Sequence, residues 1–131
     1  MKMKILIVED NSDAREIMNL LITKMGHQVI AAKNSDEAVA FAAAEGPDII
    51  FMDMQLPDVD GVETTAMLKQ NSKTSQIPVV ALTAWMSELW QEKALEAGIV
   101  RYLIKPVSSQ TLKQIIEEYT NESLTQSQLQ T

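Results

Sequence analysis

The sequence predicts an α/β domain of the (βα)5 type, with one parallel sheet of five strands that carries helices on both faces. Two patterns indicate this fold. Short apolar runs, typical of strands covered on both sides, alternate with segments whose apolar residues recur at helical spacing. Right-handed crossovers leave few possible strand orders, and among them we favour the doubly wound order 2-1-3-4-5.

Four of the expected strands are short runs with apolar residues on both alternating faces, and a further one is weaker. The four are Ile5–Val8, Asp48–Met52, Val79–Leu82 and Val100–Ile104. The weaker run, Gln28–Ala32, follows a glycine and would be the second strand in chain order. Runs of this kind are expected in a parallel sheet that is buried under helices.

Each segment that follows a strand carries the pattern of a helix. Apolar residues recur at helical spacing in three of these segments: Ala14, Ile17, Met18, Leu21 and Met25; Ala38, Phe41 and Ala42; and Leu112, Ile115, Ile116 and Tyr119. The pattern is less regular at Met86, Leu89, Trp90, Ala94 and Ala97. A short helix is expected from Gly61 to about Lys69. Gly26, Gly46 and Gly98 stand just past three of these segments. We expect them to adopt the left-handed conformation that ends helices.

The composition excludes several classes of protein. A chain of 131 residues has the size of one domain. Cysteine is absent and His27 is the only histidine, so neither a disulfide framework nor a zinc site of thiolates or paired histidines can form. The net charge of −7 would repel a phosphate backbone, and we therefore expect no direct binding of nucleic acid.

No run of the sequence has the length of a membrane span or the features of a signal peptide. We therefore expect a cytoplasmic protein that does not associate with membranes. Residues 1–120 are expected to form the domain, and residues 121–131 to form a frayed helix end and polar tail without an output domain.

Polar side chains stand at the carboxyl ends of four expected strands. Glu9 and Asp10 follow the first strand, and Asp53 follows the third. Thr83 and Lys105 follow the fourth and the fifth. These ends share the edge at which open α/β sheets bind ligands. Three clustered carboxylates favour a hard cation such as Mg²⁺, and the hydroxyl and ammonium groups would hold a phosphoryl group. A carboxylate can itself accept that group as an aspartyl phosphate.

The same turns disfavour other phosphate chemistry. The chain has no P-loop, and the acidic turn Glu9–Asp13 replaces the glycine-rich turn that binds dinucleotides. A hydrolase of small phosphate esters is the alternative from a different functional class. Hydrolases of the haloacid dehalogenase type have a second acid two residues after the nucleophile, and Gln55 occupies that place, which disfavours turnover.

Six longer runs carry a resemblance to a known family: Ile5–Asn11, Ile50–Pro57, Asp60–Gly61, Ile77–Ala84, Ala94–Gly98 and Tyr102–Pro106. Through them the chain resembles the receiver domain of two-component response regulators over about residues 4–119. The resemblance implies a flavodoxin-like sheet of strand order 2-1-3-4-5, which agrees with the order favoured above.

The resemblance implies a phosphoryl-accepting site with a metal ion. Asp53 would accept the phosphoryl group from the phosphohistidine of a partner, which is a histidine kinase or a histidine phosphotransfer protein. Glu9, Asp10 and Asp53 would hold Mg²⁺ or Mn²⁺, with the backbone carbonyl of Gln55 as a further ligand.

The resemblance also implies a switch. Lys105 would pair with the phosphoryl group, and Thr83 would donate its hydroxyl to it. Tyr102 matches the aromatic residue that turns inward on activation, and the bond between Lys105 and Pro106 would be cis. Phosphorylation would then shift the surface formed by the fourth helix, the fifth strand and the fifth helix, where a downstream protein would bind.

The expected function is therefore a phosphorylation-dependent signalling switch of a two-component system. Such a protein would catalyse its own phosphorylation and slow dephosphorylation without being a turnover enzyme. The alternative is a receiver segment of a larger hybrid kinase or regulator, acting as a phosphorelay intermediate.

The sequence departs from the pattern of the family in two places. Residues 99–101, with the sequence Ile-Val-Arg, stand where small or acidic residues are frequent, which changes the surface between the fourth helix and the fifth strand. Trp85 stands near the expected phosphoryl group, at the expected start of the fourth helix. It is either a packing residue or a cover that limits the access of water. Trp90 could share its exposed patch, which would suit a partner protein.

Overall fold

The protein forms one five-stranded sheet in the predicted order β2-β1-β3-β4-β5, with every pair of neighbouring strands parallel. The computed structural model describes residues 2–85 and 87–129, with side chains in 2–85 and 87–120. The strands are β1 (Lys4–Val8), β2 (Gln28–Ala32), β3 (Ile49–Asp53), β4 (Val79–Thr83) and β5 (Ile99–Ile104). Both the doubly wound fold and the strand order predicted from the sequence are confirmed.

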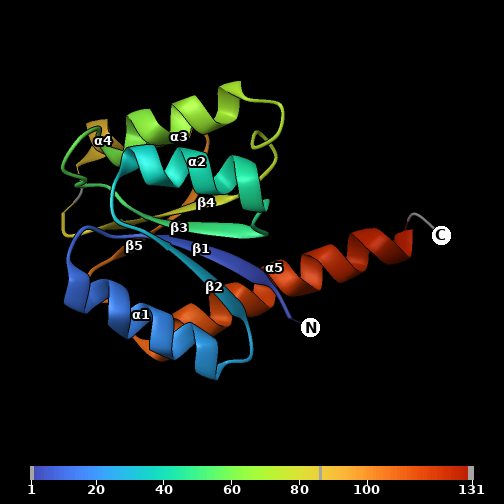
Figure 1. Ribbon diagram of the computed structural model, residues 1–131. Coiled ribbons are helices and arrows are strands. Elements are labelled where there is room, and N and C mark those ends of the chain that lie inside the picture. The colour runs from blue at the N-terminus through green and yellow to red at the C-terminus, as the bar shows by residue number, and fades with distance from the viewer. Residues whose placement is uncertain (1, 86, 130–131) are drawn as a thin grey trace.

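Five helices alternate with the strands: α1 (Ser12–Lys24), α2 (Ser35–Glu45), α3 (Gly61–Gln70), α4 (Glu88–Ala97) and α5 (Ser109–Leu129). Figure 1 shows α1 and α5 on one face of the sheet and α2, α3 and α4 on the other. The end of α5 projects past the sheet. The helix continues to Leu129, through most of the segment expected to be a frayed end and tail, and Gln130 and Thr131 lie outside the described residues.

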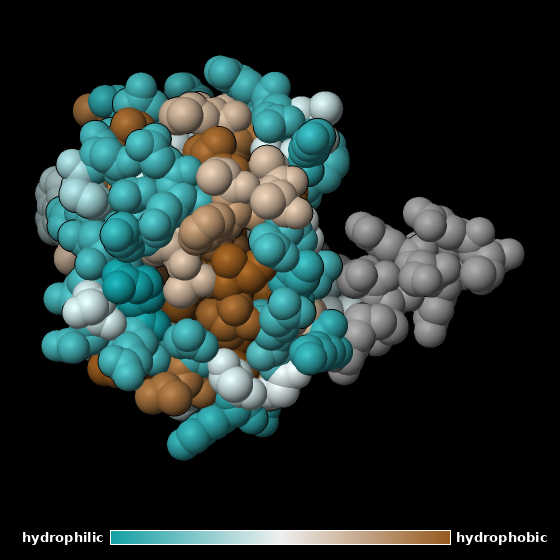
Figure 2. All heavy atoms as spheres, in the orientation of Figure 1, coloured by the Kyte–Doolittle hydropathy of each residue, from teal (hydrophilic) through white to brown (hydrophobic). Residues whose placement is uncertain are grey.

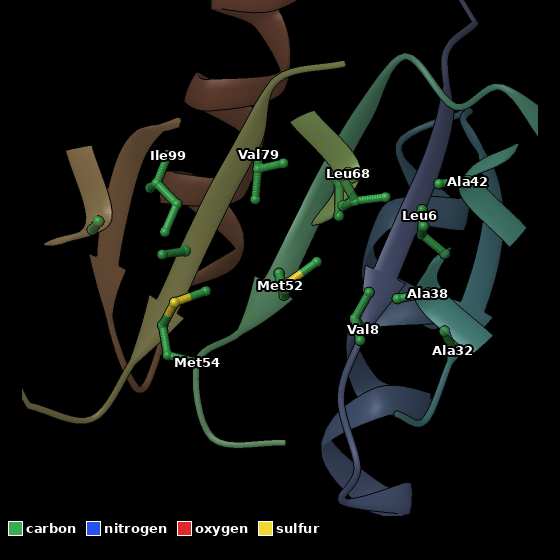
Figure 3. Packing of buried hydrophobic residues seen from close by; sticks show 13 residues of the cluster. Leu6, Val8, Ala32, Ala38, Ala42, Met52, Met54, Leu68, Val79 and Ile99 are labelled. Carbon is green, nitrogen blue, oxygen red and sulfur yellow. The ribbon is translucent and has the colours of Figure 1, made fainter. Parts of the chain in front are cut away.

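The core consists of two apolar layers, one on each face of the sheet. One layer faces α2, α3 and α4 and includes Leu6, Val8 and Met52 (Figure 3). In α2, the small side chains of Ala38 and Ala42 let that helix lie close to the sheet. Alternate residues of the same strands, such as Ile5, Ile7 and Phe51, pack against α1 and α5. The central strands are therefore buried on both faces, which is why their sequences are almost wholly apolar.

The edge strands are less covered than the sequence suggests. In β5 the side chains of Val100, Tyr102 and Ile104 are exposed, so the expectation that this run is buried on both faces is wrong. The reason is position, because β5 pairs only with β4. At the other edge, Figure 2 shows apolar atoms in a strip between α1 and α2, where the half-buried strand β2 lies.

Local hydrogen bonds and backbone conformations decide where the helices begin and end. Gly26, Gly46 and Gly98 have φ angles of 94°, 58° and 103°, so the left-handed conformation predicted for them is confirmed. The side chain of Ser87 caps α4 by accepting a hydrogen bond from the backbone nitrogen of Trp90 (3.1 Å). The fourth helix therefore begins later than expected, and Met86 lies outside the described residues.

None of the described helices combines the length and apolar character needed to cross a membrane.

Candidate functional site

The polar residues singled out in the sequence meet at the carboxyl edge of the sheet. Asp53 is the last residue of β3 and Thr83 the last residue of β4. Glu9 directly follows β1, and Lys105 directly follows β5. All strands run in the same direction, so these ends lie along one edge, and β1 and β3 flank the point at which the strand order reverses.

Lys105 connects the two buried carboxylates of the site. Its Nζ lies 2.8 Å from Asp53 Oδ2 and 3.2 Å from Glu9 Oε1. Each of these acidic residues is only 3% exposed, whereas Lys105 is half-buried. The backbone nitrogen of Lys105 donates to the carbonyl of Thr83 (2.8 Å), which attaches the lysine to the end of β4. The Lys105–Pro106 peptide bond is cis.

An acidic cluster is formed by Glu9, Asp10 and Asp53. One carboxylate oxygen from each of these residues lies within 4.8 Å of the corresponding oxygens of the other two. Glu9 Oε2 is buried and has no hydrogen-bond partner in the described part of the chain. A buried polar atom without a partner destabilises the folded protein, so binding of a positively charged ligand to this cluster would be favourable.

The electrostatics of the cluster separate its two buried acids. Burial raises the pKa of Glu9 to about 7, and the neighbouring Asp53 adds to the rise. Burial alone would also raise the pKa of Asp53, but the interactions with Glu9 and Lys105 outweigh it and lower that pKa below its ordinary value. The pKa of Lys105 is raised, because Asp53 and Glu9 outweigh the effect of burial. The ammonium group of Lys105, 2.8 Å away, therefore favours the ionised form of Asp53.

The turn after β1 is held by an arginine that the sequence analysis missed. Arg15 in α1 donates from Nη1 to the carbonyl oxygens of Glu9 (2.8 Å) and Asp10 (3.3 Å). The backbone nitrogen of Glu9 also donates to the carbonyl of Ala32 at the end of β2 (3.0 Å). An arginine in the first turns of a helix that follows an acidic strand end is the sequence signal for such a contact.

The turn after β3 is closed by a tight backbone contact. The amide of Gln55 donates to Asp53 Oδ1 (3.0 Å), and the amide of Gly61 donates to the carbonyl of Met54 (3.1 Å). A Cβ atom on Gly61 would lie 2.8 Å from the carbonyl oxygen of Asp53 and 2.4 Å from the Cε atom of Met54. Only glycine therefore lets α3 begin this close to the site.

Thr83 and Trp85 form a small turn after β4. The hydroxyl of Thr83 donates to the carbonyl of Trp85 (2.7 Å) and accepts from its amide (3.3 Å). Trp85 lies in the loop before α4 rather than at the start of the helix, because Ser87 caps α4 two residues later. Its side chain is 72% exposed.

Tyr102 lies on the exposed side of β5 and contacts an aromatic ring of α4. Its ring and that of Trp90 meet edge to face, with centroids 6.3 Å apart and planes at 82°. Trp90 is half-buried and packs on the core layer beneath α4. The expectation that Trp90 could share an exposed patch with Trp85 is therefore wrong, because Trp90 packs inward and against Tyr102.

The model of the response regulator receiver domain family matches residues 5–117 of the chain. The protein is a member of the response regulator receiver family. As a receiver it takes part in phosphorylation-dependent two-component signalling, in which receivers act as switches rather than as turnover enzymes and interact with histidine kinases and downstream targets. Receivers bind Mg²⁺ in an acidic pocket, and this chain has the cluster of Glu9, Asp10 and Asp53.

Known receivers resemble the chain over nearly their whole length. The polar-differentiation response regulator DivK of Brucella anthropi is 34% identical over 123 residues, which are 94% of this chain and 100% of that protein. A CheY-like receiver of Methanospirillum hungatei shares the fold with a TM-score of 0.88 at 24% identity, covering 96% of this chain and 99% of that one. The receiver of a Pseudomonas aeruginosa sensor histidine kinase, solved with magnesium in its active-site cleft, has a TM-score of 0.83 at 29% identity, covering 91% and 98%.

Proposed function

We propose that Asp53 accepts a phosphoryl group from the phosphohistidine of a histidine kinase or a histidine phosphotransfer protein, and that the residues around it catalyse this transfer. One observation carries the proposal. The Asp53 carboxylate is buried at the edge of the sheet where ligands bind, and it is paired at 2.8 Å with Lys105, which lowers its pKa.

The transfer joins an Asp53 carboxylate oxygen to phosphorus and breaks the phosphorus–nitrogen bond of the donor, whose electron pair stays on the imidazole. The carboxylate must be deprotonated to attack, and its lowered pKa favours that form. Lys105 would then pair with a phosphoryl oxygen, and the Thr83 hydroxyl would leave the carbonyl of Trp85 to donate to another.

The acidic cluster fits a divalent cation. Its ligands are oxygen atoms, and Glu9 Oε2 has no partner among the described residues. Burial, together with the neighbouring Asp53, raises the pKa of Glu9, so added positive charge would favour its ionised form. Glu9, Asp10, Asp53 and the backbone carbonyl of Gln55 would hold Mg²⁺ or Mn²⁺. When bound, the ion supplies positive charge against the oxygens of the transferred group.

Two further residues would shape the consequences of phosphorylation. We propose that movement of Thr83 towards the phosphoryl group lets Tyr102 turn inward from its exposed position, which alters the surface of α4, β5 and α5. We also propose that Trp85, held by its backbone to Thr83, limits the access of water to the phosphorylated site.

The test is labelling by a small phosphodonor such as acetyl phosphate in the presence of Mg²⁺. The wild type should take up acid-labile phosphate, and Asp53→Asn, which keeps the size of the side chain, should take up none. Asp48→Asn serves as the control, because Asp48 is an exposed acid at the opposite end of β3. Labelling of Asp53→Asn at the wild-type rate would refute the proposal.

A relay role is the second candidate, because a sensor histidine kinase is among the proteins whose receivers resemble this chain. In a relay the phosphoryl group leaves Asp53 for the histidine of a second phosphotransfer protein. Rapid loss of label from the phosphorylated protein to such a histidine would favour the relay, whereas loss to water alone would favour the terminal switch.

A further inference from the structure

The side chain of Asp58 connects the loop between β3 and α3 to a helix that precedes it in the chain. Asp58 Oδ1 accepts a hydrogen bond from the backbone nitrogen of Ser35 (2.9 Å), and Oδ2 accepts one from that of Asp36 (3.1 Å). Ser35 and Asp36 are the first two residues of α2, whose amides have no acceptor within the helix. The carboxylate therefore attaches the loop to the N-terminus of α2.

A second contact joins the start of α2 to α3, the helix that follows the loop. The hydroxyls of Ser35 and Thr64 share a hydrogen bond of 2.7 Å, and both residues are buried. The Thr64 hydroxyl in turn donates to the carbonyl of Asp60 (2.7 Å) at the end of the loop. The start of α2, the loop and the first turns of α3 are thus bound together by side chains from all three.

Gln55 lies between two fixed points of this loop. On one side, the Gly61 amide closes the loop on the carbonyl of Met54 (3.1 Å). On the other side, Asp58 binds the start of α2. The Gln55 amide itself donates to Asp53 (3.0 Å), so the loop turns directly against the acidic cluster.

Capping of α2 does not by itself account for Asp58. The side chain of Asn34 already caps the helix by accepting from the amide of Glu37 (2.8 Å), and the carboxylate of Glu37 accepts from the amide of Lys33 (2.9 Å). The pKa of Asp58 is lowered, first of all by the amide of Ser35, so the side chain is ionised when it binds. Its bonds differ from the local caps because they cross from one element to another.

We propose that Asp58 is a positioning residue for the metal site, and that its two bonds to α2 hold the loop where the Gln55 carbonyl can complete the ligand set. This inference rests on the proposed function, in which Gln55 and the three carboxylates bind Mg²⁺. Without Asp58, the loop has to be ordered when the ion binds, and this cost weakens binding. Partners outside the ligand set typically change metal affinity by about 10- to 100-fold when they are removed.

The experiment is an Mg²⁺ titration followed by backbone NMR shifts of residues 9–11 and 53–55. In Asp58→Ala, which loses both acceptors, the dissociation constant should rise about tenfold. In Asp58→Asn, which keeps one acceptor oxygen, it should rise less. Both variants should retain the amide spectrum of the folded protein away from the loop.

Two control variants separate positioning from other effects. Asn34→Ala removes a cap from the same end of α2 without touching the loop, so it should lower stability and leave Mg²⁺ affinity unchanged. Asp36→Asn removes one negative charge next to Asp58, so it measures the effect of charge alone, which is screened at physiological salt. The inference holds if the Asp58 variants bind Mg²⁺ more weakly than both controls.

The failure of this inference is distinguishable from that of the proposed function. If the wild type shows no saturable binding, or if Asp10→Asn binds as the wild type does, the proposed metal site is wrong. If the wild type binds and Asp10→Asn does not, but Asp58→Ala matches Asn34→Ala in affinity, only the role of Asp58 is overturned.

Discussion

Thr83 is the residue through which phosphorylation at Asp53 would reach the surface. Its hydroxyl now binds the backbone of Trp85, and it has to leave that bond to reach a phosphoryl oxygen. Thr83→Ala should therefore still accept phosphate but fail to move Tyr102. The measurement compares NMR shifts around Tyr102 with and without beryllium fluoride as a phosphoryl mimic. Thr83→Ser, which keeps the hydroxyl, should behave as the wild type, and full shifts in Thr83→Ala would contradict the coupling.

Trp85 offers a test of how water reaches the phosphorylated site. A bulky ring there would hinder the water that hydrolyses the aspartyl phosphate, so Trp85→Ala should shorten the lifetime of the phosphorylated protein. A tenfold change corresponds to about 1.4 kcal/mol of barrier, which one side chain can supply. Leu89→Ala removes another exposed apolar side chain, from α4, and should leave the lifetime unchanged. Equal decay rates in all three proteins would leave Trp85 without this role.

The sequence predicts the site residues at strand ends, but it does not predict long-range contacts between side chains and the backbone. Glu9, Asp53 and Lys105 could be predicted because each stands at the carboxyl end of an apolar strand, and parallel strands bring such ends together. Asp58 could not, because its donors are backbone amides of a distant helix that leave no mark in the sequence, whereas Arg15 was missed although its place in the first turns after an acidic strand end is a signal. The role of Asp58 depends on a contact with α2 across 23 positions of the chain.

At the scale of elements, the close start of α3 depends on Gly61. Gly61→Ala should lower the free energy of unfolding by about 1–3 kcal/mol, because the added methyl group clashes with Met54 and with the Asp53 carbonyl. It should also weaken Mg²⁺ binding, since it displaces the loop of Gln55. Gly46→Ala is the matched control, because its Cβ meets nothing within 4 Å and only the left-handed conformation is strained, at about 1 kcal/mol.

Urea unfolding and Mg²⁺ titration of the two glycine variants check this prediction. Both should be less stable than the wild type, but only Gly61→Ala should lose affinity for the ion. Unchanged Mg²⁺ affinity in Gly61→Ala would show that the position of the Gln55 loop does not depend on the close packing of α3.

Central elements were predictable from the sequence to within one or two residues, and the exceptions have local causes. The strand β3 is shifted by one residue to Ile49–Asp53, and β5 is open on one side because it is an edge strand. The start of α4 is decided by the cap of Ser87, which apolar spacing does not reveal. The polar end of α5 remains helical although it has few apolar residues to pack.

At the scale of the whole molecule, His27 predicts how stability depends on pH. Burial lowers the pKa of His27 below its ordinary value of 6.5, and its Nδ1 accepts a hydrogen bond from the amide of Met3 (3.0 Å). The unfolded chain therefore binds the proton more readily than the folded one. The contribution of neutral His27 to the free energy of unfolding is complete above pH 6.5. It is lost as the pH falls through the lowered pKa of His27 in the folded protein.

Urea unfolding of the wild type and of His27→Asn, above and below pH 6.5, isolates this effect. Asparagine keeps an acceptor for Met3 but does not titrate. The wild type should lose more stability than His27→Asn as the pH falls, while carboxylates titrate equally in both. A parallel loss in the two proteins would mean that His27 is protonated equally well in the folded chain.

We propose that this molecule stores a phosphoryl group on Asp53, and the most direct test is to map the modified residue. The wild type is phosphorylated with acetyl phosphate and Mg²⁺, reduced with borohydride to convert an acyl phosphate into a stable alcohol, digested and analysed by mass spectrometry. We predict reduction at Asp53 alone, dependent on both the donor and the metal. Reduction at Asp10 or another carboxylate, with Asp53 unmodified, would contradict the account.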